Sequence, residues 1–232
     1  MSGPNMNPIA KAVEFLERGD LVNAARAASA AGDDPDALHL LGLVRSEQGL
    51  RAEALDFFNR SLAKRPGHPH VLTNLGKTLK FLGRNVEAAS AFNAALASQP
   101  DLADALCELG ELQYRAGDYG DAETSLNEVL AQMPNHTQAK LWLGLVFKET
   151  GRPAEAEALL GEGLIQARES SLKAAFVYYL ASAQYQQGRK KDALDNFALA
   201  AQLIMSLGEN ERLVLLKDWC KGRGSVAICS DP

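Results

Sequence analysis

The sequence is poor in the residues that mark secreted, membrane-spanning or disulfide-rich proteins. Aromatic residues make up 6% of its 232 residues, and the three cysteines are the scattered Cys107, Cys220 and Cys229. Three such cysteines cannot build a disulfide framework, so we expect reduced thiols. No apolar run approaches the length of a membrane span. The first residues, MSGPNMNPIAKAVEF, lack the basic start and apolar core of a signal peptide. Together these absences predict a cytoplasmic protein.

Basic charge and catalytic motifs are also scarce. The formal net charge is -5 at pH 7, which leaves no basic footprint for a nucleic-acid partner. The sequence contains no phosphate-binding glycine loop, nucleophile elbow or HExxH. His68, His70 and His136 fall at predicted turns, and Cys220 and Cys229 lack zinc-site spacing. We therefore predict a protein that is not an enzyme, with no catalytic residues, no metal and no cofactor.

What the sequence does have is a set of residues that recurs in a fixed register. One series of glycines has spacings of 34, 34, 34 and 37 residues: Gly49, Gly83, Gly117, Gly151 and Gly188. Seven residues before each of these, and always directly after a leucine, stand Gly42, Gly76, Gly110, Gly144 and Ala181. Five residues after each stands an alanine, at 54, 88, 122, 156 and 193, and four further on Phe58, Phe92, Leu126, Leu160 and Phe197. Composition alone does not produce this many coincidences.

Each recurring residue has a physical task in a pair of packed helices. A glycine such as Gly76 removes side-chain bulk where the first helix presses on the second. A glycine such as Gly83 ends the first helix, because glycine readily adopts the left-handed conformation that follows a helix. Three units close on Pro66, Pro100 and Pro134, since proline cannot continue a helix.

A Leu-Gly, an Ala-x3-Phe and a closing Pro in 34-residue units resemble the tetratricopeptide repeat, and the resemblance covers about residues 35–207. It implies an all-α fold, a right-handed superhelix (α-solenoid) of about six helix-turn-helix repeats with a C-terminal capping helix. The chain departs from the family at the early tryptophan, which is replaced by Leu38, Leu72, Leu106, Lys140 and Val177.

This register divides the chain into segments. We predict a disordered N-terminus (1–6), a degenerate short repeat (7–34), a capping helix (208–221), a tail (222–232) and five repeats at 35–68, 69–102, 103–136, 137–173 and 174–207. The repeat at 137–173 is irregular, because Gly161 and Gly163 lie within its second helix and three residues are inserted before Ala174. The insertion predicts either a bend in the array or a longer loop between repeats.

The resemblance implies that the first helix of each repeat lines a concave groove. The residues expected to face a partner there are Asn74, Lys77, Lys80, Tyr114, Arg115, Trp142, Lys148, Tyr178, Tyr179 and Tyr185. The lysines favour an acidic part of a bound peptide, and Trp142 favours apolar side chains. The alternative is that the lysines are merely solvated and the tyrosines pack between repeats. A clamp for a chaperone's terminal carboxylate is disfavoured, because only Asn74 fits it.

The predicted function is that of a protein–protein interaction scaffold, which binds a peptide or protein segment in the groove of the superhelix. Two alternatives stay open. The array could be the substrate-recruiting N-terminal region of a larger transferase or oxygenase, or it could assemble with copies of itself as a homo-oligomer.

Overall fold

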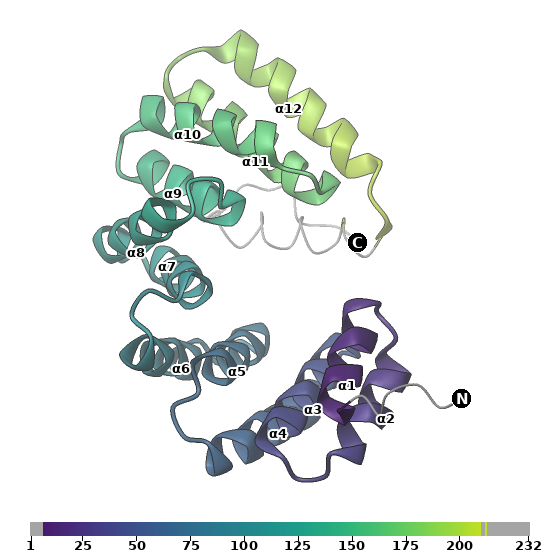
Figure 1. The fold of residues 1–232 in the computed structure, drawn as a ribbon. Coiled ribbons are helices and arrows are strands. Elements are labelled where there is room, and N and C mark those ends of the chain that lie inside the picture. The colour runs from purple at the N-terminus through teal and green to yellow at the C-terminus, as the bar shows by residue number, and fades with distance from the viewer. Residues whose placement is uncertain (1–6, 210–211, 213–232) are drawn as a thin grey trace. The chain divides into compact units, whose positions relative to one another are not determined.

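The computed structural model describes residues 7–209 and Arg212, and these residues form α-helices without any strand (Figure 1). The predicted all-α solenoid is confirmed, because consecutive helices pack in pairs, for example α3 on α4 and α11 on α12. The helices are α1 (Pro8–Glu17), α2 (Leu21–Ala30), α3 (Pro35–Glu47), α4 (Arg51–Lys64), α5 (Pro69–Phe81), α6 (Asn85–Ser98), α7 (Ala103–Ala116), α8 (Tyr119–Gln132), α9 (Thr137–Glu149), α10 (Pro153–Gln166), α11 (Ser170–Gln186) and α12 (Lys190–Met205).

The chain forms two compact units, residues 1–109 and 110–232, and their boundary falls inside α7. The first unit holds α1 to α6 and the beginning of α7, and the second holds the rest of α7 and α8 to α12. The repeat borders given above stay a prediction. Three predicted segments lie wholly or largely outside the described residues: the N-terminus at 1–6, the capping helix at 208–221 and the tail at 222–232.

The glycine that follows the recurring leucine makes room for a large side chain of the partner helix. A Cβ atom placed on Gly76 would lie 2.5 Å from the ring of Phe92, a side chain that is fully buried. On Gly144 it would lie 2.7 Å from Leu160, which is buried to the same degree. These distances are about an ångström shorter than a favourable carbon–carbon contact. The predicted packing role of these glycines is therefore confirmed.

The second glycine of each repeat ends the first helix. Gly83 has a φ of 76°, in the left-handed region that a residue with a Cβ enters at a cost. The backbone N–H of Arg84 then donates to the carbonyl of Leu79 at 3.0 Å, and that of Gly83 donates to the carbonyl of Lys80 at 2.9 Å. These two bonds satisfy carbonyls that the end of the helix would otherwise leave unpaired.

The irregular repeat absorbs its insertion in a helix and not in a loop. Only residues 167–169 separate α10 from α11, whereas residues 133–136 separate α8 from α9. The longer loop is thus wrong, and α11 instead has 17 residues where α9 has 13. Gly163 takes part in this packing, because its Cβ would lie 2.3 Å from the ring of the fully buried Phe176 on α11.

Candidate functional site

Three of the predicted groove residues lie on α5 in the first unit, where acids of α7 neutralise the lysines. Lys80 forms an ion pair with Glu108. The Lys77 ammonium lies 3.8 Å from a carboxylate oxygen of Asp104 and 3.8 Å from one of Glu108. Because two acids face two lysines, this surface carries little net positive charge. The structure therefore gives the predicted acidic-peptide subsite no electrostatic support.

The third residue, Asn74, contacts a partly buried histidine. Its side-chain nitrogen lies 2.9 Å from Nε2 of His39. Burial, assisted by the charge of His68, lowers the pKa of His39 to about 4, so the ring is neutral at pH 7. Although the His68 ring lies within 6.1 Å of the His39 ring, no group of three or more His, Cys, Asp or Glu within the described residues could hold a metal ion.

In the second unit, the Tyr114 ring of α7 contacts Tyr119 of α8 and Trp142 of α9, and we call these three residues the aromatic cluster. The ring centroids of Tyr114 and Trp142 are 5.6 Å apart, and those of Tyr114 and Tyr119 are 5.8 Å apart. The Arg115 guanidinium lies 5.0 Å from the centre of the Trp142 ring. Arg115 also donates from Nε to Glu111 Oε1 at 2.9 Å, which balances its charge. The structure thus brings together three residues that the sequence predicted for the groove, namely Tyr114, Arg115 and Trp142.

Burial affects two polar groups of this cluster, the hydroxyl of Tyr114 and the indole nitrogen of Trp142. Burial, together with the charge of Glu149, raises the pKa of the Tyr114 hydroxyl, which therefore stays protonated at physiological pH. The indole Nε1 of Trp142 is buried and has no hydrogen-bond partner in the part of the chain that the structure describes. Glu149 in turn pairs with Lys148 at 2.7 Å. Of the charged residues predicted here, both Arg115 and Lys148 are therefore matched by an acid.

The tyrosines of α11 divide between packing and exposure. The Tyr178 ring lies 5.4 Å from that of Phe197 on α12 and 5.2 Å, nearly at right angles, from that of Tyr179. Tyr179 packs against the core of the second unit, which includes Phe176. Tyr185, by contrast, is 56% exposed. Of the three tyrosines predicted for the groove, Tyr178 and Tyr179 therefore pack against neighbouring side chains, and Tyr185 is exposed.

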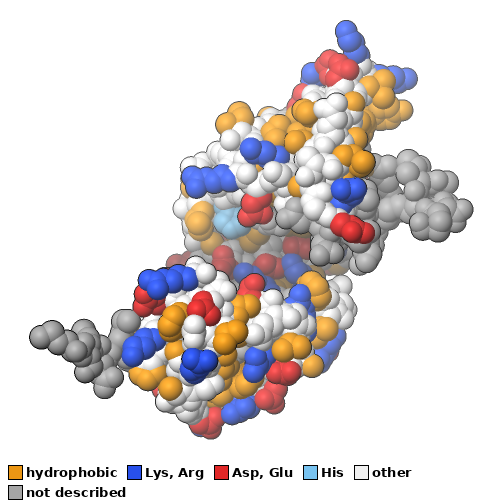
Figure 2. Space-filling model, turned by 90° about the vertical axis from the view of Figure 1, so that its right-hand side faces the viewer, with side chains coloured by type: hydrophobic (Ala, Val, Ile, Leu, Met, Phe, Trp, Pro, Cys, Tyr) orange, Lys and Arg blue, Asp and Glu red, His pale blue; other side chains and the backbone are white. Residues whose placement is uncertain are grey.

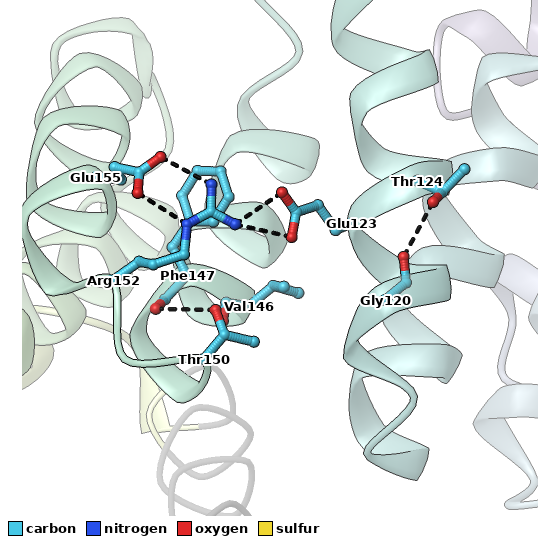
Figure 3. A network of polar contacts seen from close by, with 8 residues as sticks. All are labelled: Gly120, Glu123, Thr124, Val146, Phe147, Thr150, Arg152 and Glu155. Carbon is cyan, nitrogen blue, oxygen red and sulfur yellow. Dashed lines mark hydrogen bonds and ion pairs between the residues drawn. The ribbon is translucent and has the colours of Figure 1, made fainter.

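Sequence reasoning missed a network of arginine contacts on the second unit (Figure 3). Arg152, just before α10, donates from Nη1 to both carboxylate oxygens of Glu123 on α8, at 2.8 and 2.9 Å. It also binds Glu155 on α10 through Nε and Nη2, both at 2.8 Å, and its guanidinium lies 4.1 Å from the Phe147 ring of α9. One side chain thus joins three helices. The available signal was a Gly-Arg pair followed by an acid three residues after the arginine, which recurs at Arg84, Arg152 and Arg189.

A second missed contact occupies the position of the family's early tryptophan. Lys140 is only 4% exposed, and its ammonium lies 2.8 Å from Glu162 of α10.

On the face of the molecule drawn in Figure 2, Lys and Arg side chains are interspersed with Asp and Glu side chains. Across the residues that the structure describes, no helix is long and apolar enough to cross a membrane.

Comparison with known families agrees with this geometry. Two tetratricopeptide repeat families match the chain, one over residues 73–137 and the other over residues 113–176. The chain is a tetratricopeptide repeat protein. No curated protein matches it.

Solved structures of other proteins share its fold. PilW, a type IV pilus biogenesis factor, has 20% sequence identity and a TM-score of 0.73, covering 92% of this chain and 100% of its own. A protein of Thermus thermophilus, TTC0263, has 23% identity and a TM-score of 0.61, with 80% and 99% covered. YrrB, described as having an unusual peptide-binding site, has 17% identity and a TM-score of 0.62, with 84% and 98% covered. At these identities the likeness concerns the fold alone.

Proposed function

We propose that this tetratricopeptide repeat protein is an interaction scaffold whose second unit binds a peptide or protein segment at the aromatic cluster. The observation that carries the proposal is the contact between Tyr114, Tyr119 and Trp142, with Arg115 over the indole ring. Tyrosine, tryptophan and arginine are the residues most enriched among energetically dominant interface positions. A structural relative whose own description mentions a peptide-binding site supports the same class of function.

The partner segment is apolar and close to neutral. Arg115 is matched by Glu111 and Lys148 by Glu149, so the surface around Trp142 offers little net charge to a ligand. The indole N–H of Trp142, which no described residue accepts, adds a preference for a hydrogen-bond acceptor, such as a backbone carbonyl, once the side chain moves to meet it. Binding that depends on apolar contact and one neutral hydrogen bond changes little with salt concentration.

The test is a quantitative pulldown from native lysate with three proteins: the wild type, Trp142→Ala and the control Phe81→Ala. Phe81 is an aromatic residue of the first unit and is 70% exposed, so its loss removes an aromatic side chain that is not part of the cluster. Removal of a central interface aromatic costs about 2 kcal/mol or more, which is roughly a 30-fold loss of captured partner. We expect that loss with Trp142→Ala and none with Phe81→Ala.

The helical circular dichroism of each variant must match the wild type, so that unfolding does not imitate lost binding. An unchanged set of captured proteins with Trp142→Ala contradicts the proposed surface. Capture that disappears as salt is raised from about 50 to 500 mM contradicts the neutral partner.

A further inference from the structure

The last helix that the structure describes in full, α12, exposes an apolar stripe along one flank. Leu194 is 66% exposed and Met205 is 68% exposed, and between them lie the exposed Ala198 and Ala201. Their spacings of four, three and four residues place all four side chains on one face of the helix. The side of α12 that packs on the second unit is formed by other residues: Ala193, Ala200 and Ile204.

This stripe is complementary to itself when two copies of the helix run antiparallel. The pattern is symmetric about the point between residues 199 and 200, so Leu194 of one copy meets Met205 of the other. By the same symmetry Ala198 meets Ala201. Large side chains at both ends and small ones in the middle allow the two helix axes to approach closely at their crossing. A twofold interface requires this kind of self-matching.

Charged side chains lie near both ends of the stripe. Lys190 and Lys191 are exposed at the start of α12, and neither forms an ion pair with another described residue. Glu209 is exposed four residues past the end of α12, after a bend at residues 206–208, and Arg212 donates to the carbonyl of Leu207 near the same end. An antiparallel pair brings Lys190 of one copy near Glu209 of the other copy. This contact would favour the antiparallel register over a parallel one, in which the lysines of the two copies meet.

We propose that a second copy of this chain docks on this face, so that the protein forms a twofold dimer through α12. Contact between single helices of 16 residues, about 24 Å long, buries less than the roughly 800 Å² per partner of a standard interface. The dimer is therefore weak, with a dissociation constant in the micromolar range. Since α12 does not contribute to the aromatic cluster, the dimer would present two partner-binding surfaces and gain avidity for a partner with repeated segments.

The first experiment is sedimentation velocity on the full chain between about 1 and 200 µM, where a micromolar dimer changes its average mass. The variant Ala201→Arg places a long charged side chain in the middle of the stripe. The control Leu199→Arg makes a similar change at a residue of α12 that is 43% exposed but lies off the stripe. We expect the dissociation constant to rise about tenfold or more with Ala201→Arg and to stay near the wild-type value with Leu199→Arg.

A charge exchange tests the antiparallel register. Lys190→Glu and Glu209→Lys should each weaken the dimer, and the two changes together should restore it, because the opposite charges meet again. A wild type that stays monomeric throughout the concentration range overturns the proposal. So does an Ala201→Arg variant that leaves the mass unchanged and lowers the melting temperature, because the stripe is then covered by residues 210–232 of the same chain.

Discussion

Two glycines on one helix give a sharp test of the packing in the irregular repeat. Gly161 and Gly163 both lie within α10, and Gly→Ala in a helix interior is worth about 1 kcal/mol of added stability. A Cβ on Gly161 meets nothing within 4 Å, so Gly161→Ala should stabilise the protein by about 1 kcal/mol. The same substitution at Gly163 should have the opposite sign.

The magnitude at Gly163 follows from its neighbour. A Cβ there would lie 2.3 and 2.4 Å from two ring carbons of Phe176, a fully buried side chain with no free space into which to move. Overpacking of this kind costs about 1–3 kcal/mol, and so close an approach belongs at the upper end. After the gain in helix propensity, Gly163→Ala should destabilise by about 2 kcal/mol, which leaves the two variants about 3 kcal/mol apart.

Urea unfolding followed by circular dichroism measures this difference, since a change in stability moves the midpoint at constant slope. The double variant Gly163→Ala/Phe176→Leu should be more stable than the sum of its single changes, because the smaller side chain relieves the contact. If Gly161→Ala and Gly163→Ala shift the midpoint in the same direction and by similar amounts, the packing argument is wrong.

The remaining predictions concern His39 and the arginine network. The pKa of His39 is about 4 in the folded protein and near 6.5 in the unfolded chain, so the unfolded chain binds a proton first as the pH falls. The folded protein should therefore lose up to about 3 kcal/mol of stability between pH 6.5 and pH 4. Thermal melts of the wild type and of His39→Gln should show this loss only in the wild type. Arg152→Lys leaves one ammonium that cannot hold both Glu123 on α8 and Glu155 on α10, so it should lower the melting temperature more than Arg84→Lys. The acid that Arg84 binds is Glu87, in the adjoining first turn of α6. The difference should shrink in high salt, and equal effects of the two variants would refute the inter-helix role of Arg152.

The helix pairs could be predicted because the residues that specify them lie close together in the sequence. Gly76 and Phe92 belong to one repeat and recur in the next, so their packing shows as a register. Gly163 had no such signal, because its partner Phe176 belongs to the next predicted repeat and the contact does not recur at the other described glycines. From the sequence it looked like a weakness of α10, whereas it makes room for a core side chain.

The candidate site was only partly accessible from sequence, since charge compensation depends on which helices face each other. The sequence alone suggested that Lys77 and Lys80 bind an anion, but in the structure Glu108 of α7 pairs with both. The sequence shows that these acids lie one repeat further along, but it does not show which way their side chains point. Tyr114 and Trp142 could each be assigned to a first helix from the register, but their ring contact could not, because it depends on how α7 and α9 face each other.

The extra turn of α11 also bears on how this protein can change in length. An insertion at the start of a helix, before its first buried contact at Ala174, adds about 4.5 Å of helix and leaves every later residue in its original packing position. Evolution can therefore lengthen a helix at such points, and Ser170, Ser171 and Lys173 are free to vary more than Leu172, which packs against the core of the second unit. The same turn offers a protein engineer a place to graft a short recognition sequence.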